Sequence, residues 1–539
     1  MDNTLSTYFG NGSQDDCILV RQFAGDLRAE IITDSIIPDT TADVEKILLT
    51  TATPKIDGYY IGENALELEG SVTYQTLLLT EGGELVNLTI TEPLTLKQDI
   101  IVPSPDCRAI LIPTLDYVSA RLVNPRKLNL RSQTTVCTRL LCCLSAKPTV
   151  SGTESLDDDM NIQRCYESVN TAEVTTAEEK NIAVSQDIEL DSNAPTAADI
   201  LMSRITLRPC EVRLRGNEAD IKTEACLSLL YRTEEGNAFA SDKKFMLEKT
   251  VSLPPVDNAE WLATATPGTV SAQIAANAYG EMKIIELDFP YDLTLTAVSG
   301  KSVDAVTDMY STEFECDTAY RTLPVLKLHR MYTTNLTVNA SAERKDLGGE
   351  AVRTVFDGFV TLQDRTVHYQ EDKKKLIVEG TAAIALLGEN NAVEGSEPLY
   401  SPMTFSYPFR CELDAGSAPA EADYILDCCL ANSKFRADSH NLYADLELSI
   451  RVMAFDTASF PCLESLRLDH TTPVKRHTAP ITLCYPSGRE TLWDIAKYYK
   501  ITEDSIQLSN GMSDDNISDR KVLLIPRIQP KKAVFSKVI

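Results

Sequence analysis

The stretch "IIELDFPYDLTLTAV", residues 284–298, alternates apolar and polar side chains along its whole length. The apolar set of alternate positions consists of Ile285, Leu287, Phe289, Tyr291, Leu293 and Leu295. The positions between them include Glu286, Asp288, Asp292 and Thr294. Because successive side chains of a strand point to opposite faces, this alternation predicts a β-strand with one buried face and one face in water. Such strands favour antiparallel sheets, packed either as a sandwich or against a helix.

The same pattern recurs along the chain. Two further stretches match the first one, "KLNLRSQTTVCTRLLCC" (127–143) and "LYADLELSIRVMAF" (442–455). Each of the three is preceded by another alternating stretch: "LELEGSVTY" (66–74), "DIKTEACLSLLY" (220–231) and "KLIVEGTAAIALL" (375–387). Aligning Glu69, Glu224 and Glu379 gives two equal steps of 155 residues (224 − 69 and 379 − 224). A period of that size predicts three tandem domains rather than a solenoid.

The expected boundaries of these β domains are 1–150, 151–325 and 326–475. The second range opens with an acidic, Ser/Thr-rich segment, about residues 151–195, which we expect to be a linker and a lead-in. It contains the triplet Asp157, Asp158 and Asp159. An EF-hand calcium loop needs a glycine and a spaced glutamate that this triplet lacks, so the triplet is expected to lie in a solvated linker.

Composition and charge exclude several classes of function. The 539 residues carry 51 basic and 79 acidic side chains, a formal net charge of -28, which would repel phosphate backbones and anionic lipid surfaces. No nucleic-acid partner is therefore expected. The N-terminal residues show no secretion signal, and no apolar run has the length of a membrane span. We expect a protein made in the cytosol without transmembrane anchoring.

No catalytic or metal-binding pattern is found. The 14 cysteines form no CxxC pair, the five histidines form no HExxH pair, and there is no Gly-rich phosphate loop or G-x-S-x-G elbow. These absences predict a non-enzymatic protein with no cofactor and no metal, in which most cysteines are reduced. A hydrolase would need an acidic pair in a cleft, which sequence alone does not locate.

Strand parity separates three neighbouring cysteines. In residues 127–145, Cys142 shares the parity of the apolar residues and is predicted to be an inert core thiol. Cys137 and Cys143 have the opposite parity, and so does Arg139, whose guanidinium would favour the thiolate form. Either these two outer cysteines are available for cross-links between subunits, or another sheet covers them and all three stay reduced.

The pattern changes near the C-terminus, where residues 489–511 read "RETLWDIAKYYKITEDSIQLSNG". Thr491 is a candidate helix N-cap with Asp494 three residues later, and Leu492, Ile495, Ala496 and Tyr499 fall on one helical face. Thr502 can cap a second helix, and strands are expected at 481–485 and 521–526. This predicts a small βααβ module at 480–528. Trp493 is either a core or rim residue of the module or a ligand contact.

Two family resemblances follow from these residues. The module resembles a LysM domain, through "ETLWDIAKYYKITEDSI" and "KVLLIP". The stretches "IIPDTTADVEKIL" (36–48), "NPRKLNLR" (124–131) and "APTAADIL" (194–201) are similar to signatures of the SPOCS domain of spore-coat proteins, although the third repeat lacks them. Together the chain resembles the SipL-type spore morphogenesis proteins. The expected fold is mainly β: three tandem β-sandwich-like SPOCS domains followed by a small α+β LysM module.

The resemblance implies a scaffold or adaptor in spore envelope assembly. Such proteins act in the mother-cell cytoplasm and accumulate at the forespore surface. Their partners are the ATPase of the coat basement layer and other spore-envelope proteins, with self-association as a further option. The alternative is a binding protein in which the LysM module grips peptidoglycan or cortex glycan and the β domains are spacers.

The groove of a LysM module maps onto five residues of this chain. The usual Gly-Asp-Thr falls on Arg489, Glu490 and Thr491, and the usual Asn on Asn510, with Trp493 nearby. A charged arginine in place of the glycine narrows or recharges the groove, which favours a protein partner over a glycan. Residues 529–539 follow the module as a basic tail, which is either a solubilising end or an electrostatic clasp.

Overall fold

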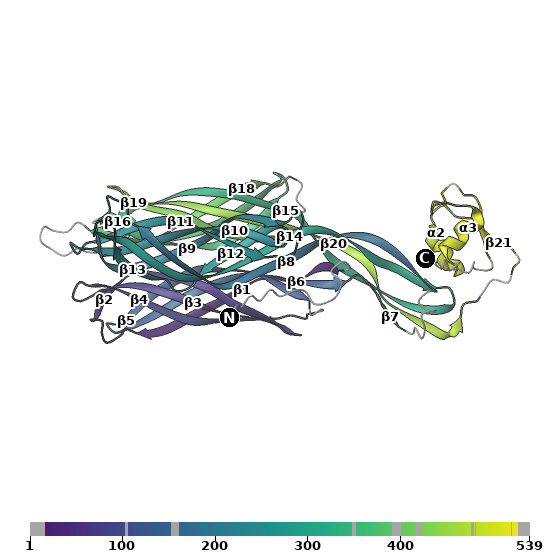
Figure 1. The fold of residues 1–539 in the computed structure, drawn as a ribbon, viewed down its shortest axis with the longest axis horizontal. Coiled ribbons are helices and arrows are strands. Elements are labelled where there is room, and N and C mark those ends of the chain that lie inside the picture. Colours follow the sequence, from purple (N-terminus) through teal and green to yellow (C-terminus); the bar gives the residue numbers. More distant parts are fainter. Residues whose placement is uncertain are drawn as a thin grey trace.

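The computed structural model describes residues 17–102, 106–151, 161–347, 352–390, 400–416, 422–475, 479, 481–518 and 520–526. Their architecture is mainly β, as the alternation predicts: long antiparallel strands form the body, and two short helices lie near the C-terminus (Figure 1). The expected buried face of residues 284–298 is confirmed, because all six of its apolar side chains are at most 3% exposed. The Asp157–Asp159 triplet and the basic tail at 529–539 lie outside the described residues.

The strands form three sandwiches that share one topology. The first contains β1 (Cys17–Ile36), β2 (Val44–Ile61), β3 (Ala65–Thr80), β4 (Leu85–Asp99), β5 (Cys107–Asn124) and β6 (Lys127–Ser145). Sheet β1-β6-β5 packs on the meander β2-β3-β4, and a single apolar core lies between them. Leu66, Leu68, Val72 and Tyr74 of β3, the predicted apolar parity, are fully buried in that core.

The second and third sandwiches repeat this order. The second consists of β8 (Ile162–Glu189), β9 (Ala197–Arg215), β10 (Glu218–Thr233), β11 (Ala238–Ser252), β12 (Glu260–Pro267), β13 (Ser271–Ala276) and β14 (Met282–Ser311). The third consists of β15 (Phe314–Glu343), a 3-10 turn (Arg344–Leu347), β16 (Val352–Gln370), β17 (Lys375–Asn390), β18 (Tyr400–Asp414), β19 (Asp423–Ala437) and β20 (Asn441–Pro473). Meanders β9-β10-β11 and β16-β17-β18 pack on sheets built around β14 and β20.

The repeat spacing predicted from the three glutamates is wrong by two residues in the middle copy. The β3–β4 hairpin turn begins at Thr80 and the β10–β11 turn at Thr233, and the two threonines make the same closing bonds to Glu84 and Asn237. These equivalent positions are 153 residues apart (233 − 80). Alternation hides the error, because a shift of two residues preserves which side chains face the core.

The prediction that residues 151–195 form a linker and a lead-in is also wrong. After β7 (Thr149–Ser151), most of that segment is β8, a 28-residue strand that pairs with β14 along its length. Its polar composition is accommodated because much of it is exposed. The expected boundary at residue 325 falls inside β15, which pairs with β1 at Val20↔Val325, so one sheet runs from the first sandwich into the third.

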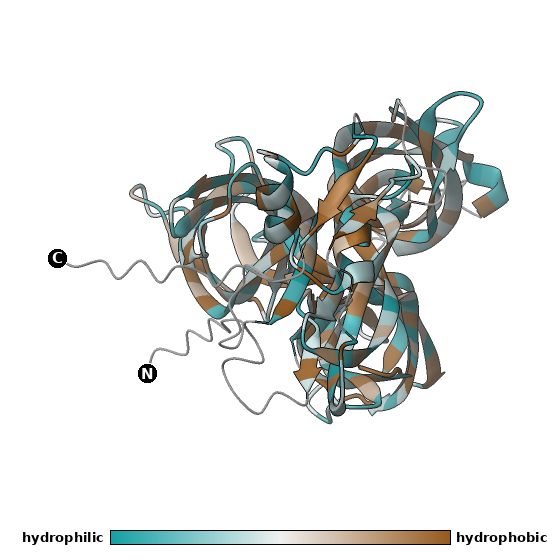
Figure 2. Ribbon diagram, turned by 90° about the vertical axis from the view of Figure 1, so that its right-hand side faces the viewer, coloured by the Kyte–Doolittle hydropathy of each residue, from teal (hydrophilic) through white to brown (hydrophobic). Residues whose placement is uncertain are grey.

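The three sandwiches lie side by side around a common junction when viewed end-on (Figure 2). Between the first and third, Arg139 and Arg21 bind Asp423 at 3.1 Å. Between the second and third, buried Arg451 donates to the Pro209 carbonyl at 2.6 Å and stacks over Trp261. Removing one partner of a desolvated ion pair leaves the other charge buried without a partner. These contacts are therefore costly to break.

The cysteine predictions are partly wrong. Cys142 is fully buried, as its parity predicts, but it is not a free thiol: it is disulfide-bonded to Cys107 of β5, and Cys143 is bonded to Cys17 of β1. Burial raises the pKa of the Cys137 thiol despite the nearby Arg139 charge. The outer face of β6 is covered there by the third sandwich, through the contact of Arg139 with Asp423.

An arm extends from the body toward the C-terminal module (Figure 1). It is formed by the distal parts of β8, β14, β15 and β20, residues 162–170, 302–311, 314–322 and 461–473, which continue without a break from strands of the sandwiches. Its small apolar core contains Ile162, Val306, Met309, Leu463, Leu466 and Leu468. Because the same strands build the body and the arm, the direction of the arm is set by the sandwiches.

Candidate functional site

The C-terminal module has the predicted βααβ order: β21 (Thr482–Cys484), α2 (Leu492–Tyr499), α3 (Glu503–Asn510) and β22 (Leu523–Ile525). Thr491 and Asp494 form a complete capping box at the start of α2, and Thr502 caps α3. Lys500 and Gly511 end the two helices in the left-handed conformation, which glycine adopts without strain. The inward residues Leu492, Ile495, Ala496, Ile506 and Leu523 are almost completely buried.

The predicted site residues fall into two groups. Arg489, Glu490 and Thr491 precede α2 and are exposed, with the Glu490 carboxylate accepting from the Ser487 N–H at 2.6 Å. Asn510 lies at the end of α3 and acts as a structural clip. Its side-chain amide donates to the Leu524 carbonyl at 2.8 Å and accepts from the Leu524 N–H at 2.7 Å, so it occupies the outer edge of β22.

Trp493 does not point into open solvent but contacts the arm of the same chain. Its indole Nε1 donates to Asp308 Oδ2 at 2.9 Å, and its ring meets Tyr310 edge-on with centroids 4.9 Å apart. Tyr310 is fully buried, and its hydroxyl donates to the Ile501 carbonyl at 2.6 Å. The aromatic residue predicted as a core, rim or ligand contact therefore takes part in an intramolecular docking site.

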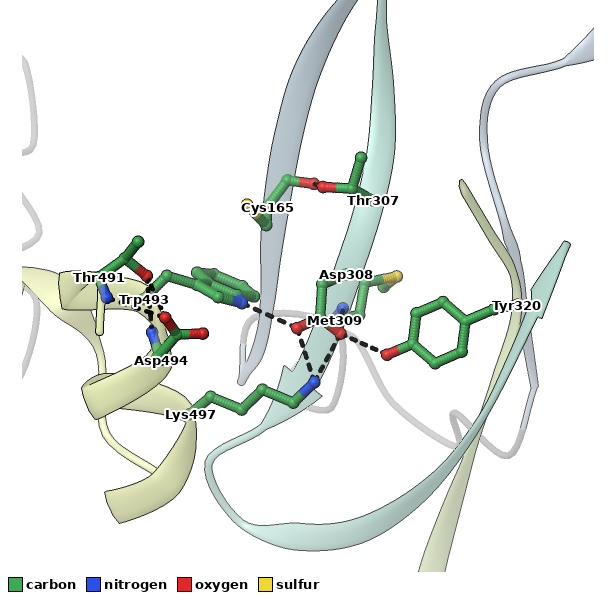
Figure 3. Close-up of polar contacts among 9 residues, drawn as sticks. All are labelled: Cys165, Thr307, Asp308, Met309, Tyr320, Thr491, Trp493, Asp494 and Lys497. Atoms are coloured by element: carbon green, nitrogen blue, oxygen red, sulfur yellow. Dashed lines mark hydrogen bonds and ion pairs between the residues drawn. The ribbon is translucent and has the colours of Figure 1, made fainter. Parts of the chain in front are cut away.

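Asp308 is the centre of this docking site (Figure 3). Its carboxylate accepts from Trp493, from Lys497 Nζ at 2.6 and 2.7 Å, and from the Tyr320 hydroxyl at 2.8 Å. Burial alone would raise the pKa of Asp308, but the bonds from Lys497, Trp493 and Tyr320 outweigh it and hold the pKa below its usual value. The Asp308–Lys497 pair is thus ionised and fastens α2 to β14.

A second ion pair lies at the rim of the same contact. Lys500 Nζ is 3.4 Å from Glu315 of β15, and the Glu315 side chain is 48% exposed. Water screens such a pair, so it contributes little to docking compared with Asp308. Asp308 and Tyr310 were not among the predicted site residues. They are distant from the module in sequence, since Asp308 precedes Trp493 by 185 residues. No local pattern signals the contact.

The module also presents an exposed apolar surface on its two-stranded sheet, which we call the sheet face. The members of the sheet face are Ile481, Leu483, Tyr485, Val522 and Leu524, which are between 38% and 72% exposed. Leu483 and Leu524 are directly paired across the sheet, so the set is contiguous. The helices cover the opposite side of the sheet through Leu523 and Ile525. Contiguous exposed apolar side chains of this kind mark interaction surfaces.

A separate cavity of about 270 Å³ lies between the first and second sandwiches. It is lined by β2, β5, β8, β12 and β14, with several threonines and the carboxylates of Asp106, Glu178 and Asp292. Asp292 is already engaged: it binds Lys55 at 2.8 Å and accepts from the Asn181 N–H. Among the described residues, no cluster of His, Cys, Asp or Glu side chains is arranged to hold a metal ion.

Comparison with known proteins identifies one part of the chain. The LysM domain family matches residues 489–526, which contain both helices and β22 and confirm the resemblance of the module. A search of curated proteins finds no match to the chain. A LysM domain is a binding module for glycans, including peptidoglycan, or for proteins. No helix in the described part of the chain combines the length and apolarity needed to cross a membrane.

Proposed function

We propose that this protein is a non-enzymatic scaffold of spore envelope assembly, in which the LysM domain is an adaptor that docks a protein partner. The observation that carries the proposal is the sheet face, because Ile481, Leu483 and Tyr485 present apolar side chains that a glycan-binding groove does not require. Interface cores are enriched in such aromatic and aliphatic anchors. The SPOCS-like resemblance of the repeats supports the spore-coat setting.

Two further features support the adaptor role. The first loop carries Arg489 and Glu490 where a glycan-binding LysM module has Gly-Asp, and both side chains are exposed. Trp493 and Lys497 tie the domain to the arm, which fixes its orientation on a long body. A pre-oriented module loses less rotational freedom when it binds, and this favours assembly. The proposed partner is the ATPase of the coat basement layer, met at the forespore surface from the mother-cell cytoplasm.

The second candidate is a peptidoglycan- or cortex-glycan-binding protein. The match to the LysM family favours it, since that family includes glycan binders. Its groove would involve Arg489, Glu490, Thr491 and Asn510. Both the oxygen and the nitrogen of the Asn510 amide bond the backbone of Leu524, and the Thr491 hydroxyl caps α2. These polar groups are therefore already engaged and are not free to bind a sugar.

Binding of the full chain to the basement-layer ATPase and to purified peptidoglycan or chitin oligomers tests the proposal. Leu483→Glu should weaken ATPase binding by about 2 kcal/mol, roughly 30-fold, if it removes an interface anchor. Tyr498→Glu is the matched control, because Tyr498 is 74% exposed on α2 rather than on the sheet face. Tight oligomer binding without ATPase binding would refute the protein-docking role and support the glycan alternative.

A further inference from the structure

The polar face of β14 does not lie in water along its whole length. Thr294 and Thr296 have the parity that points away from the core of the second sandwich, and both line the cavity of about 270 Å³ between the first and second sandwiches. Strands β2 and β5 of the first sandwich form the opposite wall of this cavity. The Thr296 side chain is thereby covered, since the residue is only 4% exposed. A polar group that is covered in this way needs a hydrogen-bond partner.

Strand pairing gathers hydroxyl groups on the β14 side of the cavity. They lie in two rows across β12, β14 and β8, which are Thr264, Thr294 and Glu178, followed by Leu262, Thr296 and Thr176. Directly paired side chains of this kind lie about 5 Å apart. None of the four threonine hydroxyls makes a hydrogen bond to a residue that the structure describes. Their oxygens are nevertheless not sealed within protein, so they are available to a molecule in the cavity.

The first sandwich contributes carbon to the same cavity. Ile56 and Tyr59 of β2 line it, together with Ile110 of β5, which is 5% exposed. A molecule between the two walls therefore meets hydroxyl groups on one side and apolar side chains on the other. Small-molecule sites typically combine an apolar lining with a few polar groups that fix the orientation of the ligand.

The charges around the cavity are balanced. Asp292 is 2.8 Å from Lys55, and Glu178 is 3.4 Å from Lys180. The third carboxylate, Asp106, attracts the guanidinium of Arg108, which also lines the cavity. Neither an anion nor a cation would find an uncompensated opposite charge there, and burying a charge without a counter-charge is costly. The balance therefore favours a neutral ligand.

We propose that this cavity binds one neutral sugar unit, with its hydroxyls on the threonine rows and its C–H face on Ile56, Tyr59 and Ile110. A sugar ring has this division between polar rim and apolar face, and its hydroxyls both donate to and accept from threonine. Small-ligand pockets have volumes of about 300–1,000 Å³, so a cavity at the lower end suits a single ring rather than an oligosaccharide. The inference concerns the body of the protein and does not depend on what the LysM domain binds.

Nuclear magnetic resonance titration of the full chain with glucose, galactose, mannose and N-acetylglucosamine tests the proposal. At least one of these sugars should bind with a Kd of about 1 mM or tighter. Thr294→Val keeps nearly the same side-chain shape but removes the hydroxyl, and it should raise that Kd about two- to tenfold. Thr95→Val is the matched control, because Thr95 is an exposed residue of β4 outside the cavity, and it should leave the Kd unchanged.

Two results would overturn the proposal. One is that none of the four sugars binds at about 10 mM, which would mean that water alone occupies the cavity. The other is a sugar affinity that Thr294→Val leaves unchanged, which would place the sugar elsewhere on the chain, including the LysM domain. Thermal unfolding of both variants checks that they are folded.

Derivatives of the bound sugar test its charge and its source. Its amino and phosphate derivatives should bind more weakly than the neutral sugar, and tighter binding of either would refute a neutral ligand. A trisaccharide of the same sugar distinguishes the two sources of such a unit. Comparable affinity for the trisaccharide would show that the end of a glycan enters the cavity, whereas loss of binding would identify the free monosaccharide as the ligand. Both of these results support the sugar site.

Discussion

Replacing Asp308 by asparagine should release the LysM domain from the arm. The substitution keeps the shape of the side chain but removes the charge that receives Lys497. It leaves one acceptor oxygen for four donors: Lys497, Trp493, Tyr320 and the backbone N–H of Met309. Hydrogen bonds to charged groups contribute about 1.5–3 kcal/mol each when buried. The Asp308 side chain is 19% exposed and that of Lys497 is 37% exposed, so solvent screening reduces this value. We expect a loss of about 2 kcal/mol, roughly 30-fold in the docking equilibrium.

The fluorescence of Trp493 measures this equilibrium. The chain has only two tryptophans, and a Trp261→Phe background leaves Trp493 as the single reporter. Undocking exposes its indole, so the Asp308→Asn chain should undock at a lower urea concentration than its parent. Glu315→Gln is the matched control, because it removes only the rim pair with Lys500. If both variants undock at the same urea concentration as the parent, Asp308 does not hold the domain and the interpretation is wrong.

The pH dependence follows from the same carboxylate. The pKa of Asp308 in the folded protein lies below its ordinary value of 3.8. A depressed carboxyl pKa contributes stability that is fully present above the unfolded value and is lost as the pH falls through the folded value. Docking of the parent chain should therefore be insensitive to pH near neutrality and weaken only below about pH 4. The Asp308→Asn chain should lack this acid transition, so the two chains should converge at low pH.

Two further predictions concern the module and the cysteines. Asn510→Ala should lower the free energy of unfolding of the LysM domain by about 1–3 kcal/mol, because the Leu524 N–H and carbonyl lose their partners. Differential scanning calorimetry measures this change. An unchanged unfolding transition would contradict a structural role of the Asn510 side chain. In alkylation followed by mass spectrometry without reductant, the exposed Cys210 should react first, while Cys17, Cys107, Cys142 and Cys143 should react only after reduction. Early labelling of Cys142 would mean that the β5–β6 disulfide is absent.

Local patterns predicted the elements whose stability is local. The alternation of residues 284–298 identified a strand and its buried face, because successive side chains of a strand point to opposite faces of the sheet. The capping box at Thr491 and Asp494 was readable for a similar reason, since it joins residues three positions apart. The polar stretch that became β8 was misassigned as a linker. The residues of β14 that pair with it lie between 95 and 149 positions later (284 − 189 and 311 − 162), and a half-exposed strand needs few apolar residues.

The docking site was not predictable from local patterns. Asp308 lies in β14 among many carboxylates of an acidic chain, and only the fold brings it to Lys497 and Trp493. The disulfides were missed in the same way. Cys107 and Cys142 become neighbours through the register of β5 on β6, which pairs them directly, and sequence spacing carries no information about that register. The binding role of the five predicted groove residues remains a prediction. The hydrogen bonds of Thr491 and Asn510 hold the module itself together.

The continuity of the strands bears on the role of the docking site in the proposed scaffold. β14 begins in the core of the second sandwich with Ile285 and ends at the module with Tyr310, which is buried in the core of the LysM domain. One continuous strand therefore joins the core of the second sandwich to the domain, and its register with β8 shifts once within the arm, between Val306 and Asp308. A partner bound to the sheet face would be held at a set distance and direction from the three-sandwich body, whereas a freely tethered LysM domain would lose rotational freedom on each binding event. Loss of the Asp308 contact should then impair ordered assembly more than it impairs partner binding by itself.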